Sequence, residues 1–300
     1  MLEILGELAM RKVGWIIYNG NLRSVKFMEQ IEWLKKAGEN AGFQMETKAN
    51  NELLVFFENN DAKLTDSRLP DFVFYWDKDL YLARQLENLG VRLFNSARAI
   101  EICDDKALTF QILANHQIRM PKTMIAPKIF QKVEDEKHLA IIDQHFEYPV
   151  VLKEAFGSFG EQVYLVENKQ ELAHHTRRIA HKPYIVQEFI KSSRGKDARL
   201  QVIGNQVVAA MLRVSENDFR ANVTAGGRMY PYQPTREEED LGIRVAQLVG
   251  ADFAGVDLLF GEKGEPILCE VNSNAHFKNI YDCTGVDVAQ LMMEYIKEKS

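Results

Sequence analysis

The first third of the chain alternates between short apolar runs and longer stretches with apolar residues at helical spacing. The short runs have the length and composition of buried strands, and both of the longer stretches are followed by glycine. The predicted strands are residues 12–18, 53–57, 71–75 and 91–94, and the predicted helices are residues 25–41 and 80–89. Alternation of this kind predicts a small parallel sheet with helices on its faces.

Two loops in this region directly follow predicted strands and are candidates for substrate contacts. Ligands of open α/β sheets collect beyond the carboxyl ends of the strands. Residues 19–23 (NGNLR) and 76–79 (WDKD) occupy such positions. Their polar residues also suit ordinary loops, so both interpretations stay open.

The rest of the chain favours helices combined with hairpins. The predicted helices are residues 95–116, 171–180, 237–249 and 286–297, and the predicted strands are residues 148–153, 163–166, 184–190, 198–203 and 206–214. Residues 132–145 and the crossing after Asn274 carry no clear pattern of either kind. With 300 residues, 46% of them hydrophobic, the chain is long enough for two or three domains.

Three side chains with oxygen atoms interrupt two apolar runs near the carboxyl end. Asp257 lies in FAGVDLLF, and Glu270 and Asn272 lie in ILCEVNSN. Side chains alternate along a strand, so Glu270 and Asn272 share a face, and a turn at residues 261–266 can bring Asp257 beside them. Carboxylate and amide oxygens suit Mg²⁺. Because buried carboxylates need a partner, the pattern predicts either a magnesium site or ion pairs with lysines.

A glycine loop and a polar strand face add candidate chemistry. Lys153 ends a predicted strand and precedes EAFGSFGEQ, whose glycines let the backbone approach a phosphate closely. A plain hairpin is the alternative, and neither a P-loop nor a dinucleotide fingerprint occurs. Asp197, Arg199 and Gln201 share one face of the strand that follows, so we expect a polar group over that face.

Composition narrows the function classes. A net charge of −6 argues against broad binding of nucleic acid. The three cysteines have no metal spacing and indicate no disulfide framework, which fits the reducing cytosol. The opening MLEILGELAM does not have the charge order of a secretion signal, and no run approaches the roughly 18 apolar residues of a membrane span. We expect a cytoplasmic protein without membrane contact.

The motifs, taken in order, resemble those of the ATP-grasp ligases. A helical lysine is followed by a strand-end lysine with a glycine loop, a QEF strand, an aspartate, an FRAN loop, and the oxygen cluster. Among these ligases, QEFIKSSRGKDARLQVIGNQVVAAMLR, NDFRANVTAGG, FAGVDLLF, EVN and TGVDVA are most similar to the RimK-like glutamate ligases and the LysX-type enzymes of lysine biosynthesis. The resemblance runs from about Asn95 to the end, and more loosely through the amino-terminal part.

The resemblance implies an ATP-grasp fold of the α/β (α+β) class. Residues 1–94 would form a small parallel α/β domain, and residues 95–186 and 187–300 two α+β subdomains that sandwich ATP. The implied activity is ligation of a carboxylate to an amino-acid amine such as that of glutamate, through an acyl phosphate. The implied cofactors are ATP and Mg²⁺, with Mn²⁺ as an alternative, and a homo-oligomer, either a dimer or a tetramer, is expected.

Position by position, the resemblance implies nucleotide contacts, metal ligands, catalytic arginines and substrate contacts. The nucleotide contacts are Lys106 and Lys153 (phosphates), Gly157, Ser158 and Gly160 (closing loop), Gln187, Glu188 and Phe189 (adenine hinge), Asp197 (ribose) and Asn222 (terminal phosphate). The metal ligands are Asp257, Glu270 and Asn272, the catalytic residues are Arg220 and Arg199, and the substrate contacts are Asn274 and Lys278.

The chain departs from the RimK-like pattern in two places. After the metal ligands it reads EVNSNAHFKN, where those enzymes usually carry small residues and a proline-glycine turn, so acceptor specificity is open. Phe189 replaces a commoner tyrosine. Two rival functions are a nucleotide-binding module without catalysis, and a D-alanine dipeptide or glutathione-like synthetase, which the FRAN and FKN segments disfavour.

Overall fold

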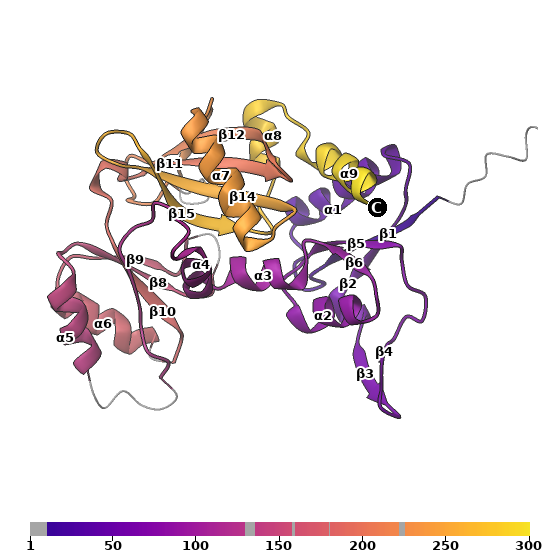
Figure 1. Ribbon diagram of the computed structural model, residues 1–300, viewed down its shortest axis with the longest axis horizontal. Coiled ribbons are helices and arrows are strands. Elements are labelled where there is room, and N and C mark those ends of the chain that lie inside the picture. Colours follow the sequence, from indigo (N-terminus) through magenta and orange to yellow (C-terminus); the bar gives the residue numbers. More distant parts are fainter. Residues whose placement is uncertain (1–10, 130–135, 158–159, 180, 222–225) are drawn as a thin grey trace, which may run out of the picture.

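Figure 1 shows the chain, as a computed structural model, with three main sheets and one separate hairpin. The structure describes residues 11–129, 136–157, 160–179, 181–221 and 226–300. Within these ranges, no helix has both the length and the apolar character that crossing a membrane requires. One parallel sheet and two antiparallel sheets, each covered by helices, confirm the predicted α/β (α+β) class.

The first sheet is parallel and has the strand order β2-β1-β5-β6. Its strands are β1 (Val13–Tyr18), β2 (Gln44–Ala49), β5 (Phe72–Trp76) and β6 (Arg92–Phe94), and its helices are α1 (Val25–Asn40) and α2 (Leu80–Asn88). Side chains alternate along β1, so Ile16 packs with α1 while Trp15 and Ile17 pack with α2. The two helices therefore cover opposite faces, and the carboxyl-terminal helix α9 (Val288–Lys299) lies beside α1.

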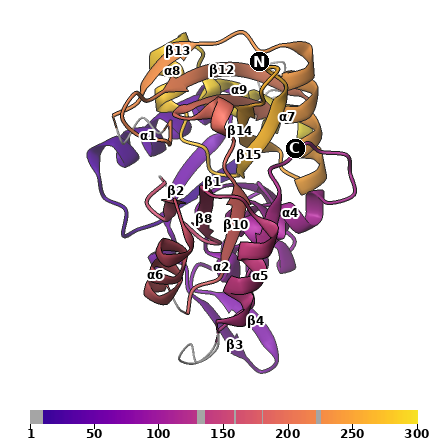
Figure 2. The same ribbon diagram turned by 90° about the vertical axis from the view of Figure 1, so that its left-hand side faces the viewer.

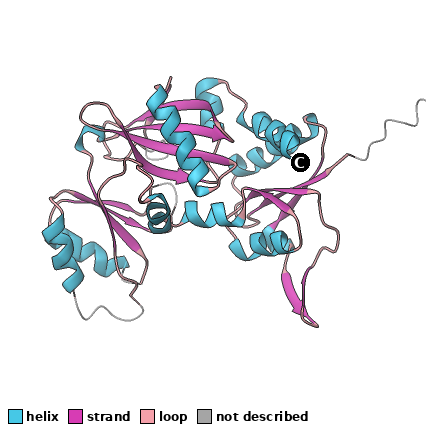
Figure 3. Cartoon of the chain, in the orientation of Figure 1, coloured by secondary structure: helices cyan, strands magenta, loops and turns pink. Residues whose placement is uncertain are grey.

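One expectation for this region is wrong, and one strand was not predicted. Residues 53–57 do not join the sheet, because β3 (Val55–Glu58) pairs with β4 (Asp61–Leu64) in a hairpin that projects from the domain after a short 3₁₀ turn, η1 (Asn50–Glu52) (Figure 3). The fourth strand is instead β2, whose polar sequence gave no strand signal. At this sheet edge only Met45 and Ala49 of β2 are buried, so an apolar run is not needed.

The central sheet is antiparallel, in the order β7-β10-β8-β9. Its elements are β7 (Thr123–Ile125), α5 (Lys137–His145), β8 (Val150–Glu154), β9 (Val163–Val166), α6 (Lys169–Ile179) and β10 (Tyr184–Glu188). Both helices pack on one face, against Val150, Leu152 and Val186, as the turned view of Figure 2 shows. The opposite face, which includes Val151 and Lys153, is left for the cavity described below.

The third sheet is antiparallel, in the order β13-β12-β11-β14-β15. Its elements are η2 (Lys191–Ser193), β11 (Lys196–Ile203), β12 (Gln206–Val214), β13 (Arg228–Pro231), α7 (Arg236–Val249), β14 (Phe253–Phe260) and β15 (Pro266–Asn272), followed by α8 (Lys278–Thr284). Apolar side chains of β11 and β14 pack under α7. The predicted hairpins are confirmed, whereas β7, β13, α5 and α8 were not predicted. Three of these are short, and α5 has only Leu139 and Ile142 buried within a charged stretch of sequence.

The predicted helix at residues 95–116 is in fact two helices, α3 (Ala97–Asp104) and α4 (Lys106–Leu113). Asp105 between them has an extended backbone, and its side chain accepts hydrogen bonds from Ala107 N (2.9 Å) and Leu108 N (3.2 Å). Such a cap starts a new helix and satisfies its first amide groups. The break makes Lys106 the first residue of α4. The division of the chain at residues 94 and 186 stays a prediction.

Candidate active site

A cavity of about 550 Å³ is lined by all three sheets. It brings together most of the residues predicted from the sequence. Those that line it are Lys106, Lys153, Gly157, Gly160, Gln187, Glu188, Phe189, Asp197, Arg199, Arg220, Asp257, Glu270, Asn272 and Asn274. Ser158 and Asn222 lie outside the described residues. Lys278 does not line the cavity and instead pairs with Asp282 one turn along α8, at 3.1 Å.

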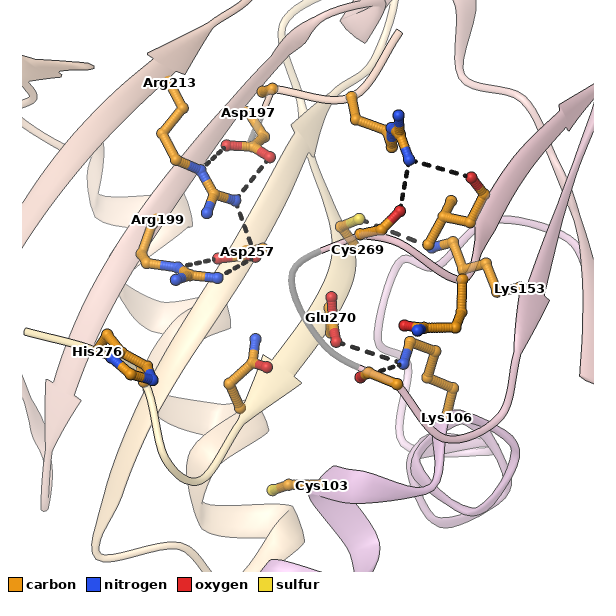
Figure 4. A pocket seen from close by; sticks show the side chains of 18 of the residues that line it. Cys103, Lys106, Lys153, Asp197, Arg199, Arg213, Asp257, Cys269, Glu270 and His276 are labelled. Atoms are coloured by element: carbon orange, nitrogen blue, oxygen red, sulfur yellow. Dashed lines mark hydrogen bonds and ion pairs between the residues drawn. The ribbon is translucent and has the colours of Figure 1, made fainter. Parts of the chain in front are cut away.

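Two buried lysines, Lys106 and Lys153, lie on the same side of this cavity, and Asp197, Arg199 and Asp257 lie on the other side (Figure 4). Lys106 is 6% exposed; its Nζ donates to Gly157 O at 3.3 Å and lies 3.7 Å from Glu270 Oε1. Lys153 is 8% exposed, and its Nζ contacts Cys269 Sγ at 3.9 Å. A buried ammonium group needs more than a long ion pair or a thiol to offset its lost hydration. The pair therefore suits a polyanion in the cavity.

The hinge residues use their side chains to join β10 to the segment before it. The buried Gln187 amide donates to Thr123 Oγ1 at 2.8 Å, and Glu188 Oε1 accepts from Lys122 N at 2.9 Å. The ring of Phe189 packs edge-on against Phe219, with 6.3 Å between centroids. Since both polar side chains and the Glu188 N–H, which donates to Lys122 O at 3.0 Å, are engaged, a planar ligand here would depend on other backbone groups of this segment and on the ring of Phe189.

Two aspartates and two arginines form a network of ion pairs across three strands of the third sheet, β12, β11 and β14. Asp197 on β11 forms a two-bond ion pair with Arg213 on β12, at 2.6 and 2.7 Å. Arg199 on β11 forms another with Asp257 on β14, at 2.7 Å for both bonds, and Arg213 Nη2 also donates to Asp257 Oδ2 at 2.9 Å. Burial alone would raise the pKa of Asp257, but the two guanidinium groups outweigh burial and hold that pKa at about 2.

Arg213 is a residue of this network that was not predicted from the sequence. It is 4% exposed and lies directly opposite Asp197 in the β11–β12 hairpin. If the register of the hairpin had been known, Arg213 could have been identified as the residue opposite Asp197. As a result, Asp197 lines the cavity but gives both carboxylate oxygens to Arg213, and its predicted ribose contact stays a prediction.

The predicted metal ligands lie together on β14 and β15. Asp257 is directly opposite Glu270, and Gly255 is directly opposite Asn272. Asp257 already accepts three hydrogen bonds, which leaves one of the four acceptor positions of a carboxylate. The Glu270 side chain is 30% exposed to the cavity side and has Lys106 as a distant ion-pair partner, and the buried Asn272 Nδ2 has no partner among the described residues.

This donor set fits Mg²⁺ better than a transition metal. No three histidine, cysteine, aspartate or glutamate side chains of the described residues form a metal site by themselves. Mg²⁺ typically takes one or two carboxylates and completes its shell with water and substrate phosphates. Glu270, the Asn272 amide oxygen and the remaining position of Asp257 meet that requirement.

Arg220 connects two loops at the rim of the cavity. Its guanidinium pairs with Asp218 at 3.0 and 2.7 Å and donates to Gly160 O at 2.5 Å. Gly160 has a φ of 74°, which a side chain would disfavour. Arg220 thus holds the end of the glycine loop in place.

One end of the cavity is lined by the loops after β1 and β5, which were candidates for substrate contacts, and such contacts stay a prediction. Asn19, Asp77 and Lys78 come from these loops, and the Asn274 amide donates to Asp77 O at 2.9 Å. Lys78 pairs with Asp104 at the end of α3. Burial raises the pKa of Asp77.

Comparison with known proteins gives matches over most of the chain. Residues 103–296 match the family model of the RimK-like ATP-grasp domain. The chain is 35% identical to human N-acetylaspartylglutamate synthase A over 232 residues, which is 76% of this chain and 58% of the synthase. It is 37% identical over 217 residues to a probable alpha-L-glutamate ligase of Citrobacter koseri, covering 71% of this chain and 70% of that ligase.

A solved structure shares the whole fold. The ATP-grasp ligase PsnB, solved with a precursor variant, Mg and ADP, aligns with a TM-score of 0.69 over 97% of this chain and 99% of PsnB. Only 18% of residues are identical, so this likeness concerns the fold alone. It confirms the predicted ATP-grasp architecture.

Proposed function

Because the chain belongs to the RimK-like ATP-grasp family, we propose that it is an ATP-dependent ligase that joins a carboxylate to an amine. In the first step, a carboxylate oxygen bonds to the γ-phosphorus of ATP as the bond from that phosphorus to ADP breaks. In the second, the amine nitrogen attacks the acyl carbon, phosphate leaves, and the amine loses a proton. The observation that carries the proposal is the pair of buried lysines opposite Glu270 and Asn272 in one cavity.

Lys106 and Lys153 would bind the phosphates of ATP as point charges. Their burial strengthens this interaction, because the charges act in a medium of low dielectric constant. Backbone groups near Glu188 and the ring of Phe189 would hold the adenine. Gly157 and Gly160 would let the loop between them lie close to the phosphates and exclude water, which otherwise hydrolyses an acyl phosphate.

Glu270, Asn272 and Asp257 would hold Mg²⁺, with Mn²⁺ as an alternative. When bound, the ion supplies positive charge that neutralises the phosphates. The protein itself would contribute the fixed positions of these oxygen ligands on paired strands. Arg199 and Arg213 keep Asp257 ionised and oriented. Such pre-organisation needs little rearrangement as charge moves during the reaction.

Arg199 is better placed than Arg220 to act on the reacting groups. Arg199 lies on the cavity wall, and its Nε and Nη2 donate to Asp257, whereas its Nη1 has no hydrogen-bond partner among the described residues and can donate to the acid as its charge is redistributed. Arg220 has its guanidinium engaged by Asp218 and Gly160. We therefore assign Arg220 the role of closing the loop, with a contact to the terminal phosphate only if that loop rearranges.

Glutamate is the amine donor that the relatives favour. One relative is named N-acetylaspartylglutamate synthase A and another is named a probable alpha-L-glutamate ligase, although the chain spans less than two thirds of the human synthase. We propose glutamate as one substrate and a peptide, protein or small metabolite as the acid. A cytoplasmic homo-oligomer without nucleic-acid or membrane partners is part of this proposal.

A phosphate-release screen tests the function. Glutamate and other amino acids are paired with small peptides and acidic metabolites in the presence of ATP and Mg²⁺, and products are read by mass. Lys153→Ala and Glu270→Gln should lower ADP release to background, whereas the exposed Glu298→Gln on α9 should match the wild type. Full turnover in the first two variants would refute the site, and nucleotide binding without ADP formation across the panel would favour the non-catalytic module.

A further inference from the structure

The second step of the proposed reaction needs a proton acceptor. The amino group of an amino acid is mostly protonated at neutral pH, and the protonated nitrogen has no lone pair with which to attack a carbon atom. The group that removes the proton must reach the amine by a hydrogen bond. Asp77, on the loop after β5, is a carboxylate of the cavity lining that belongs neither to the ion-pair network nor to the proposed metal site.

Asp77 has one carboxylate oxygen that the protein holds and one that it does not hold. Its Oδ1 accepts from Lys78 N at 2.8 Å and from Asn19 Nδ2 at 3.3 Å. Its Oδ2 is buried and has no hydrogen-bond partner among the described residues. A buried polar atom without a partner is rare in folded proteins and calls for an explanation, such as a bound group or a catalytic role. Oδ2 is therefore the atom of Asp77 that is available to a substrate.

Two more buried oxygens that lack a partner in the described part of the chain belong to other walls of this cavity. Gln30 Oε1 comes from α1, and Asn274 Oδ1 comes from the segment between β15 and α8. The amide nitrogens of both side chains are engaged, because Gln30 Nε2 donates to Lys26 O at 3.2 Å and Asn274 Nδ2 donates to Asp77 O at 2.9 Å. A carbonyl oxygen can only accept, so these contacts identify the nitrogen and the oxygen of each amide. The unpartnered atoms of Gln30, Asp77 and Asn274 are thus all acceptors.

Three acceptors and one negative charge match an ammonium group. An ammonium group has three N–H donors, one positive charge and no acceptor, whereas a carboxylate or a phosphate ion could only accept. A single water molecule has two donors and would leave one of the three oxygens without a partner. The three side chains line the cavity while the oxygens themselves are covered, so a rotation about the last side-chain bond would turn each oxygen toward the ligand.

The surroundings of Asp77 suit a carboxyl group that takes up a proton and gives it back. Burial raises the pKa of Asp77, and the charge of Asp79 adds to this rise, while the hydrogen bonds to the Asp77 carboxylate oppose it. Lys26 and Lys78 also line this end of the cavity, and Lys78 pairs with Asp104. A general base is most effective when its pKa lies near the working pH. The folded protein moves the pKa of Asp77 in that direction.

We propose that Gln30, Asp77 and Asn274 bind the ammonium group of the amino-acid substrate, and that Asp77 is the base that removes its proton. This rests on the proposed function, which supplies the acyl phosphate. Asp77 takes one proton from the ammonium group, and the freed lone pair of the nitrogen bonds to the acyl carbon. The bond from that carbon to the phosphate oxygen then breaks, and the second proton that the nitrogen loses leaves with the phosphate.

Competition between two nucleophiles tests the role of Asp77. The wild type and Asp77→Asn are incubated with ATP, Mg²⁺, the acids of the phosphate-release screen, a mixture of amino acids that includes glutamate, and hydroxylamine. Hydroxylamine is uncharged at neutral pH, so it attacks an acyl phosphate without first losing a proton to a base. Mass spectrometry gives the ratio of amide to hydroxamate. Both products come from the same acyl phosphate, so the ratio does not depend on the fraction of enzyme that is folded.

Asp77→Asn should lower the ratio of amide to hydroxamate by about 100-fold or more, as expected for the loss of a general base. Its rate of hydroxamate formation should stay close to that of the wild type, because the acid is activated before the amine reacts. Asp77→Glu keeps a carboxylate and should lower the ratio less. Asp71→Asn is the matched control, since it removes the same charge at the opposite end of β5, where Asp71 accepts from Val13 N at 2.7 Å outside the cavity. It should keep the wild-type ratio.

The proposal is overturned if Asp77→Asn keeps the wild-type ratio, whether both products persist or both decrease together. In the first case Asp77 has no part in the reaction, and in the second it acts before the amine. A wild type that forms hydroxamate but no amide also overturns it, and leaves the activation of an acid by ATP standing. A wild type that forms neither product with any acid contradicts the proposed function itself.

Discussion

Replacing Arg213 should lower the free energy of unfolding, because the ion-pair network depends on its buried guanidinium group. Arg213→Met removes both hydrogen bonds to Asp197 and one to Asp257. Asp257 keeps Arg199, but Asp197, which is 7% exposed, loses its ion-pair partner. A buried charge left without its partner typically costs about 3–5 kcal/mol. We expect a loss of that size in the free energy of unfolding, measured by urea denaturation at pH 7.

A second variant tells whether the unpaired charge is the cause. In Asp197→Asn/Arg213→Met both charges are absent, so the loss should shrink to about 1–2 kcal/mol, as expected for hydrogen bonds without a stranded ion. Asp197→Asn alone leaves Arg213 with Asp257 as its partner and should cost less than Arg213→Met. If Arg213→Met costs under about 1 kcal/mol, or no more than the double variant, the reasoning about the buried carboxylate is wrong.

Two further predictions concern pH and helix capping. The pKa of His276 is about 4 in the folded state and has its ordinary value of 6.5 in the unfolded state. Between these two pH values the unfolded state binds a proton that the folded state does not bind. As pH drops from 7 to 4, the free energy of unfolding should therefore fall by about 3 kcal/mol more in the wild type than in His276→Gln. Urea denaturation of both proteins at each pH measures this difference. Equal changes in the two proteins would mean that the folded state does not lower the pKa of the ring. Asp105→Ala removes the cap of α4 and should cost about 1 kcal/mol. It should also weaken ATP binding, because Lys106 follows the cap. Removing the Asp287 cap of α9, which also accepts from Trp33 Nε1 at 3.2 Å, should cost at least as much stability and leave ATP binding unchanged.

The order and type of most elements could be predicted because their burial is simple. Apolar residues of β1 and β5 are buried on both faces, so these strands appear as continuous apolar runs. Helix α1 has one buried face at helical spacing, with Phe27, Ile31 and Leu34 on it. Elements without this contrast were missed, such as the edge strand β2 and the helix α5, in each of which only two residues are buried. Which elements could be predicted from the sequence therefore depended more on their pattern of burial than on the intrinsic helix or strand propensity of their residues.

The break between α3 and α4 shows a second limit. The apolar spacing of residues 95–116 continues through the break, so periodicity alone predicts one helix. Asp105 has its side chain on the amides of the next turn, which is a local cap that competes with helix continuation. An aspartate within a periodic stretch was the available signal. Its effect matters for function, since it places Lys106 at the start of a helix that borders the cavity.

Asp257, Glu270 and Asn272 lie together as predicted, yet the strand register that brings them together could not be predicted from the alternation of side chains along each strand. Counted from the turn, Leu258 lies opposite Leu268, and a regular continuation would place Asp257 opposite Cys269 and Glu270 opposite Val256. Val256 is buried under α7, so Glu270 would then point into an apolar core. A β-bulge between Asp257 and Leu258 shifts the register by one residue and brings Asp257 opposite Glu270.

The β11–β12 hairpin also contains a β-bulge that sets which side chains lie opposite each other. A bulge between Gln201 and Val202 shifts β12 by one residue, so that Asp197 lies opposite Arg213, whereas a regular register would place Leu212 there. Val208 is the residue of β12 that this bulge leaves without a partner on β11, so deleting Val208 should make the pairing regular from the turn and still leave Asp197 opposite Arg213. The loss of unfolding free energy should therefore be smaller than that of Arg213→Met, since the carboxylate keeps its partner. A deletion variant that loses as much stability as Arg213→Met would show that the bulge itself is needed to hold the two side chains together.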